Sequence, residues 1–434
     1  MNNFHNLFPN NSKTVAFYNT FSQVINMSSF DQEEFGQNIG KPINSHERIY
    51  NASIFRHEMA HWIDHISTLW GHNSLLLLYN ALNARATKNL NEFWRIKFYA
   101  DSCKQDTLFD YFTEIHNQID GSRHNRWSYN FSTGFRFQSN GYVNQEKPIL
   151  FTTFRANEEK IVARVPISIV SILETIATKE EFKLKFQSIS LIEDVVERKR
   201  LEKLYEEELF KLIYNSKLTL YNVVAHLTAN IAKASDIIWA LEVSSSVGTV
   251  VLNLPDKEID KVLEYKTGIA EIDSRITAFK KSKDKGYLFY NLLVNLVNTK
   301  GSNHYNIQDL IQSSNLSDIA VIEQQIIESM ESNIKNLIPG PFFHRARKIL
   351  EYGIQIFKLR GLDGKKEGYE FKVENFPQRP NLMFGDTFYN ENHFNLQVAI
   401  EKLNNGLDLN LDEEYFLFEY YQKKLDEFIN ICGI

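Results

Sequence analysis

Cysteine is scarce in this 434-residue chain, which contains only Cys103 and Cys432. The two residues lie far apart and form no C-x-x-C pair, which argues against a disulfide framework and against a thiolate metal site. So few thiols fit a reducing compartment, and we expect a cytoplasmic protein.

Long apolar runs and a targeting segment are also missing. The longest apolar runs, such as residues 165–170, are far shorter than the roughly 20 residues of a membrane-spanning helix. The segment from Met1 to Asn6 lacks the cationic start and apolar core of a secretory signal. We therefore expect no membrane partner.

An excess of positive charge is absent as well. The chain has 48 Lys and Arg against 54 Asp and Glu, a net charge of −6, and both signs are scattered along it. Proteins that bind nucleic acid usually carry a basic patch that neutralises phosphates. Nucleic acid is therefore not an expected partner.

The remaining composition is that of an ordinary folded protein. Hydrophobic residues make up 43% and charged residues 24% of the chain, which excludes a disordered protein. Helical apolar spacing predominates, but residues 126–168 are rich in aromatic and β-branched residues and contain turn signals. We expect an α+β fold that is mainly α-helical, with β hairpins at about 126–167, the second of which pairs about 149–155 with about 160–167.

The segment His57-Glu58-Met59-Ala60-His61 matches the zinc-hydrolase motif H-E-x-x-H. With 12 His in 434 residues, a shuffled chain would contain this motif only about 0.02 times. On a helix, residues four apart lie one above the other, so both imidazoles can face one ion while Glu58 reaches a water molecule beside it. The motif predicts a zinc site.

This motif lies within a helix predicted at about residues 45–70. Asn44 and Glu47 resemble a capping box at its start, and Gly71 predicts its end. Apolar residues recur at spacings of three and four on one face, whereas the two histidines lie on another. One face is expected to pack in the core and the other to line a cleft.

A catalytic zinc usually has three protein ligands and one water, so this site needs a third side chain. His65 is eight residues from His57, about 12 Å along a helix, too far for both to bind one ion. The metzincin motif is excluded because Asp64 and Ser67 stand where it requires glycine and histidine. The third ligand is therefore expected on a separate downstream element.

Glu174 is the best candidate for that ligand. It lies early in an apolar helix predicted at about 168–186. A buried carboxylate needs a partner, and a metal ion is one such partner. Ala177, one turn on, is small enough to let two helices approach. The alternative is a solvated glutamate favoured by the helix dipole, and Glu180 and Glu181 are weaker candidates expected on the solvated face.

With these residues the chain resembles a zincin metallopeptidase of the gluzincin type, over about residues 45–185. The resemblance implies that zinc (Zn2+) binds to His57, His61 and Glu174. It also implies that Glu58 is the catalytic general base, which takes a proton from the attacking water and returns it to the leaving amine.

The chain departs from the family at a position whose side chain would help to orient a zinc ligand. Thermolysin-like members have an aspartate four residues after the ligand glutamate, where this chain has Thr178. Asp64, one turn beyond His61, is an alternative hydrogen-bond acceptor that could orient an imidazole through its other nitrogen. A surface aspartate without that role is the competing interpretation.

The resemblance also implies how a substrate would bind. A protein or peptide substrate would lie as an extra strand along a sheet edge above the helix, and the hairpin at 149–167 is the candidate edge. The side chain that stabilises the oxyanion is left open among His226, His304, His344 and several tyrosines.

The expected organisation is a zincin-like catalytic core at 1–190, a helical region completing the core or cleft at 191–338, and a C-terminal helical accessory region at 339–434. The expected function is that of an intracellular zinc metallopeptidase of narrow specificity. The alternatives are an inactive zincin-fold interaction scaffold, a non-proteolytic zinc hydrolase, and a bacterial toxin or defence effector protease. The last is suggested by the long helical region, which the chemistry itself does not need.

Overall fold

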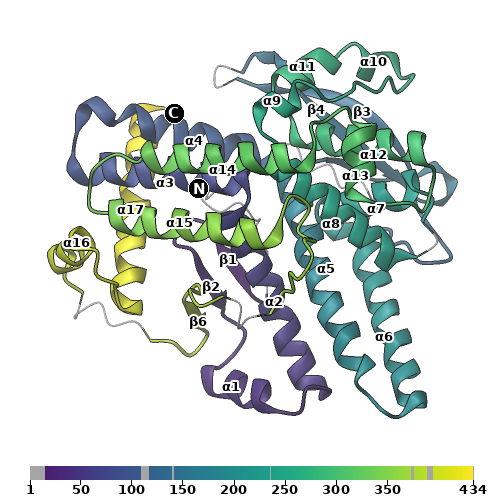
Figure 1. Ribbon diagram of the computed structural model, residues 1–434. Helices are drawn as coiled ribbons and strands as arrows, with labels where there is room; N and C mark the ends of the chain where they lie inside the picture. Colours follow the sequence, from purple (N-terminus) through teal and green to yellow (C-terminus); the bar gives the residue numbers. More distant parts are fainter. Residues whose placement is uncertain are drawn as a thin grey trace.

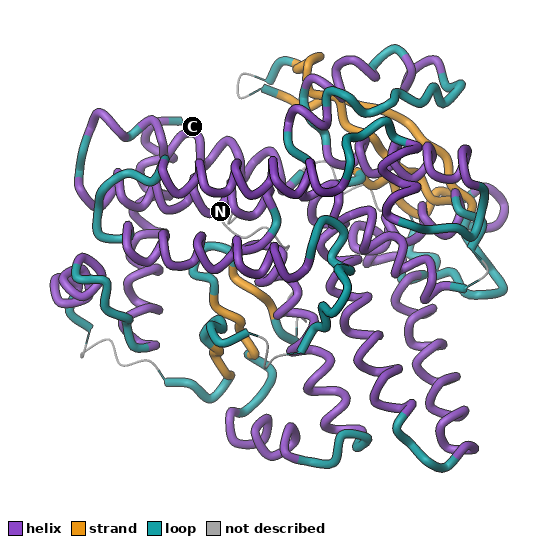
Figure 2. The backbone as a smooth tube through the Cα atoms, in the orientation of Figure 1, coloured by secondary structure: helices purple, strands orange, loops and turns teal. Residues whose placement is uncertain are grey.

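The computed structural model describes residues 15–108, 117–138, 141–234, 236–372, 376–388 and 394–433. These ranges are mainly helical and contain two small three-stranded sheets (Figure 1, Figure 2). The mainly α-helical α+β class expected from the sequence is thereby confirmed. None of the helices described in these ranges has both the length and the apolar character needed to cross a bilayer.

The helices of the first part of the chain are α1 (Gln32–Gly40), α2 (His46–Ser67), α3 (Leu69–Thr87), α4 (Trp94–Thr107), α5 (Ile169–Ser190), α6 (Val195–Ile213), α7 (Thr219–Ile231) and α8 (Ile237–Asn253). Those of the second part are α9 (Asp256–Ile259), α10 (Ala270–Asp273), α11 (Ile276–Lys281), α12 (Lys285–Lys300), α13 (Ile307–Ser313), α14 (Ile319–Lys335), α15 (Phe343–Arg360), α16 (Leu396–Asn404) and α17 (Leu411–Cys432). Short 3-10 turns are η1 (Leu90–Glu92), η3 (Asn157–Glu159) and η4 (Ser216–Leu218).

One sheet is an antiparallel meander of β3 (Ser128–Phe137), β4 (Val143–Arg155) and β5 (Ile161–Pro166). Its strands follow one another in space as they do in the sequence, and β4 pairs with β5 so that Phe151 faces Pro166 and Phe154 faces Ala163. This register confirms the pairing of about 149–155 with about 160–167. The predicted hairpins share β4 as their common strand.

The other sheet joins two strands from the N-terminal part of the chain to one strand from its C-terminal part. It consists of β1 (Phe17–Asn19), β2 (Val24–Met27) and β6 (Leu382–Phe384), in the order β1-β2-β6. The β1 and β2 strands are antiparallel, whereas β6 runs parallel to β2, with Ile25 facing Leu382. Figure 1 shows this sheet beside α2.

A continuous hydrophobic core extends from the motif helix into the C-terminal helices. The α2 helix packs against α5 and α15, and α3 packs against α14. Met59 of α2, Leu173 of α5 and Leu350 of α15 are all buried in the same cluster. The C-terminal helices therefore contribute to the core that holds the motif, while the boundaries near 190 and 338 stay predictions.

The end of the motif helix differs from the prediction. The α2 helix ends at Ser67, and Thr68 caps the next helix, α3, because its side-chain oxygen accepts a hydrogen bond from the Gly71 amide at 3.1 Å. Gly71 therefore lies inside α3 and does not stop α2. A Cβ atom at Gly71 would lie 2.1 Å from the His65 carbonyl oxygen, so glycine allows α3 to begin close against the end of α2.

The start of the motif helix also differs from the prediction. Its N-cap residue is Ser45, which makes no side-chain capping bond, so the capping box suggested by Asn44 and Glu47 is wrong. Glu47 instead lies 3.3 Å from the Lys41 ammonium, and this ion pair with the preceding loop draws the carboxylate away from a reciprocal cap.

Candidate metal centre

The candidate ligands come from two helices that pack side by side, α2 and α5 (Figure 1). A capping box fixes the start of α5, since Ser168 and Ser171 each accept a hydrogen bond from the other's backbone amide. Glu174 follows within the next turn and is buried, with an exposed fraction of 9%. The interpretation of Glu174 as a solvated glutamate at the helix start is therefore wrong.

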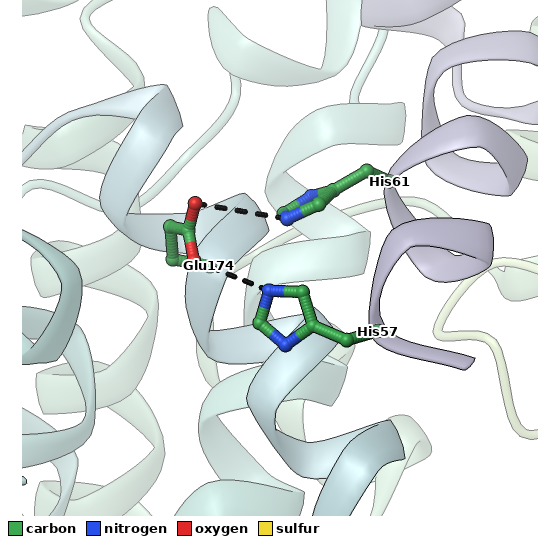
Figure 3. Close-up of side chains that lie close together, drawn as sticks. All are labelled: His57, His61 and Glu174. Atoms are coloured by element: carbon green, nitrogen blue, oxygen red, sulfur yellow. Dashed lines mark ion pairs between the residues drawn. The ribbon is translucent and has the colours of Figure 1, made fainter. Parts of the chain in front are cut away.

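His57, His61 and Glu174 converge on one point, as Figure 3 shows. The Nε2 atom of His57 lies 3.5 Å from Glu174 Oε2, and the Nε2 atom of His61 lies 3.6 Å from Glu174 Oε1. One ligand atom from each side chain lies within 4.8 Å of the others. In the part of the chain that the structure describes, no other His, Cys, Asp and Glu side chains form such a group.

These separations fit a metal ion better than direct hydrogen bonds. An N–H···O hydrogen bond normally spans about 2.7–3.2 Å, shorter than both distances. Two ligand atoms of a tetrahedral zinc, each about 2.0–2.1 Å from the ion, lie about 3.4 Å apart. Two imidazoles and one carboxylate also form the donor set of a catalytic zinc site, which leaves one position for water. The residues present therefore fit zinc.

The two histidines differ in their electrostatic environment. Burial lowers the pKa of His61 well below its usual value, and the neighbouring charge of His57 lowers it further. Burial also opposes the protonated form of His57, but the nearby carboxylates of Glu174 and Glu181 outweigh it and raise the pKa of His57 well above its usual value. A proton on His57 thus balances the nearby carboxylates, and a bound cation would replace that proton.

Glu58 lies between the two histidines in sequence and is only 6% exposed. Burial raises the pKa of its carboxyl to about 7, the charge of His57 opposes this, and the charge of Glu174 adds to it. The Tyr18 backbone amide, in β1, donates a hydrogen bond to the same carboxyl. A carboxyl with this pKa can accept and release a proton near neutral pH.

The strand that lies beside the motif helix is β1. Besides its amide contact with Glu58, Tyr18 places its hydroxyl 2.9 Å from Nδ1 of His65, one turn beyond the motif. The hairpin at 149–167, expected as the sheet edge above the helix, packs mainly on α7, α11 and α12. The sheet edge next to Glu58 therefore belongs to the β1-β2-β6 sheet.

Two glutamates expected on a solvated face turn inward. Glu180 is buried and accepts a hydrogen bond from Arg56 of α2 at 2.6 Å. Glu181 Oε2 lies 3.2 Å from His57 Nδ1, and Lys185 donates to Glu181 Oε1 at 2.7 Å. Burial opposes the charge of Glu181, but His57 and Lys185 outweigh it and lower the pKa of Glu181 to about 2. Cationic partners explain why both carboxylates lie inside.

Asp64 is buried, with an exposed fraction of 1%, so the interpretation of a surface aspartate is wrong. Its Oδ1 atom accepts a hydrogen bond from Arg360 Nη2 at 2.6 Å, and Arg360 is the last residue of α15. This bond attaches the C-terminal part of the chain to α2 one turn beyond His61. The role of Asp64 in orienting an imidazole of the site stays a prediction.

The candidates for stabilising an oxyanion lie in different surroundings. His226 is buried, with Nε2 2.8 Å from the last backbone carbonyl of α6, and His304 Nε2 lies 2.7 Å from a carboxylate of α13. His344 contacts the ring beside it at the start of α15. Burial raises the pKa of Tyr221, on α7, and the charge of the candidate ligand Glu174 raises it further, so this phenol stays protonated near neutral pH.

The sequence predicted the group of His57, His61 and Glu174, but it offered Glu181 only as a weaker candidate on a solvated face and did not identify Arg360 as the partner of Asp64. A signal was available for Glu181: it lies seven residues, two helical turns, after Glu174, and a lysine follows four residues later. Arg360 is distant in sequence and gave no such signal.

Comparisons with protein-family models, curated proteins and solved structures find no match for this chain. The function is therefore inferred from the residues and their geometry.

Proposed function

We propose that this protein is a zinc-dependent metallopeptidase with a gluzincin-like site. The proposal rests on one observation above all: Glu174 presents one carboxylate oxygen to Nε2 of His57 and the other to Nε2 of His61, at 3.5 and 3.6 Å. Zinc bound there would lower the pKa of a water ligand towards neutrality and polarise a substrate carbonyl.

Glu58 is the proposed general base. Its position within the H-E-x-x-H motif and its pKa of about 7 support a carboxylate that takes a proton from water and delivers it to the leaving amine. Tyr221 is the proposed hydrogen-bond donor to the developing oxyanion, since its phenol stays protonated and its ionisation is opposed by Glu174. Protein or peptide is the proposed substrate class, because it is the class implied by the motif, and the cytoplasm is the proposed location.

Metal analysis of the purified protein tests the site. We expect about one zinc per chain in the wild type, loss of that zinc in His57→Ala, and weaker binding in Glu174→Ala. His304→Ala is a matched control, because this histidine is partly exposed and bonds to α13. Full zinc retention in both ligand variants would contradict the metal site.

Cleavage of a peptide library, followed by mass spectrometry of the new termini, tests the activity. We expect Glu58→Gln to keep its zinc and to lose about 10²–10⁴-fold in turnover, since an amide cannot accept the proton. If the zinc-loaded wild type and Glu58→Gln gave the same termini at the same rates, the peptidase proposal would fail while the metal site remained.

A further inference from the structure

His57 is held from both sides of its imidazole ring. Its Nε2 atom faces Glu174 at 3.5 Å, and its Nδ1 atom lies 3.2 Å from Oε2 of Glu181. The two glutamates are two helical turns apart on α5, so one face of this helix supplies both contacts. His57 thus presents one nitrogen to the metal-ligand group while the other is engaged by a carboxylate outside that group.

Glu181 is itself held in place by a cation. Its second oxygen, Oε1, accepts a hydrogen bond from Lys185 at 2.7 Å, and the Lys185 ammonium also donates to Glu208 Oε1 on α6 at 2.8 Å. The Lys185 side chain is only 4% exposed and its ammonium lies 4.4 Å from the centre of the Phe182 ring. Fixing a lysine side chain in one buried position costs conformational entropy, and its ion pairs with two carboxylates offset this cost.

The resulting network crosses three helices, from His57 on α2 through Glu181 and Lys185 on α5 to Glu208 on α6. An ionised carboxylate only accepts hydrogen bonds, so Nδ1 of His57 must be the donor to Glu181. When a metal ion takes the place of the second proton of His57, this bond leaves the lone pair on Nε2, the nitrogen that faces Glu174. Lys185 balances the charge of Glu181, which keeps the carboxylate an acceptor.

We propose that Glu181 is a positioning residue of the metal centre, which orients His57 through Nδ1 and is held by Lys185. The inference rests on the proposed zinc site. The carboxylate that orients His57 would then lie seven residues after Glu174. The residue four positions after Glu174 is Thr178, which carries no charge. Loss of such an outer carboxylate typically lowers metal affinity about 10–100-fold.

Zinc affinity, measured by competition with a chromophoric chelator, tests this role. We expect Glu181→Gln to weaken zinc binding about tenfold and Glu181→Ala about 100-fold, with one zinc per chain still reached at saturation. Lys185→Met should also weaken binding, because Glu181 loses the cation that fixes it. The absorption spectrum of the Co2+-loaded protein should change in the Glu181 variants, since it reports the geometry of the ligands.

Glu180→Gln is the matched control. This neighbouring carboxylate is buried on the same helix but pairs with Arg56, so its loss should lower stability and leave zinc affinity and the Co2+ spectrum unchanged. Wild-type zinc affinity and an unchanged Co2+ spectrum in Glu181→Gln and Lys185→Met would overturn the inference while leaving the zinc site intact. A wild-type protein that bound no zinc would overturn the inference together with the proposed function.

Discussion

Asp64 and Arg360 form a buried ion pair, with 2.6 Å between Asp64 Oδ1 and Arg360 Nη2. Their side chains are 1% and 9% exposed. The same guanidinium donates to the Ser67 hydroxyl at 2.7 Å, so the last residue of α15 binds two residues in the last turn of α2. The helix that carries His57 and His61 is therefore fixed by the C-terminal part of the chain.

Replacing Arg360 should be costly. Arg360→Met leaves the Asp64 carboxylate buried without its cation, and we expect the free energy of unfolding to fall by about 3–5 kcal/mol. Urea titration at pH 7 measures this loss. Arg347→Met is the control, because Arg347 pairs with Glu351 at the surface and such pairs contribute about 0–1 kcal/mol. Similar losses in the two variants would contradict a structural role for the Asp64–Arg360 pair.

Two glycine substitutions should change stability in opposite directions. A Cβ atom at Gly71 would lie 2.1 Å from a backbone oxygen of His65, which cannot move without shifting the helix, so we expect Gly71→Ala to cost about 1–3 kcal/mol or more. Gly36, within α1, has no heavy atom within 4 Å of such a Cβ, and Gly36→Ala should add about 0.5–1 kcal/mol. Thermal melts of both variants provide the measurement, and a stabilising Gly71→Ala would show that the close contact is wrong.

Acid should destabilise the protein through His226. Burial lowers the pKa of this histidine to about 4, and the hydrogen bond to Ile213 only partly opposes the shift. The unfolded chain takes up a proton near pH 6.5, whereas the folded chain does so only near pH 4. The stability from the neutral, buried ring is thus complete above pH 6.5 and is lost as the pH falls towards 4, by about 3 kcal/mol.

Urea titrations at several pH values between 7 and 4 test this. His226→Gln should lower stability at pH 7, because the ring stacks on Trp127 at a centroid distance of 5.4 Å. The same variant should show a shallower loss of stability with acid, since about one proton fewer is taken up on unfolding. Equal slopes for the wild type and His226→Gln would rule out this histidine as the cause.

Metal removal should lower the melting temperature only when the ligand group is intact. Zinc at 100 times its dissociation constant adds about 2.7 kcal/mol to the stability of a protein that binds it only when folded. A chelator should therefore lower the melting temperature of the wild type and of Glu58→Gln, and leave that of His57→Ala unchanged. A chelator effect of the same size in His57→Ala would place the responsible metal elsewhere.

The sequence by itself determined the parts of the site that depend on local periodicity. The four-residue spacing of His57 and His61 places both on one face of any helix, and the apolar run around Glu174 predicted a buried carboxylate on a second helix. The β4–β5 hairpin was predictable for the same reason, because alternating residues and a short turn specify an antiparallel pair within one segment.

Only the tertiary structure decided what surrounds those residues. Glu181 faces His57, Arg360 neutralises Asp64, and β1 rather than the 149–167 hairpin lies beside Glu58. Each of these contacts joins segments far apart in the chain, and a buried charge and a solvated charge have the same helical periodicity in sequence. Burying a charged carboxylate is costly unless a cation lies beside it. The cation beside each carboxylate is determined by how α2, α5 and α15 pack together, which the sequence pattern does not specify.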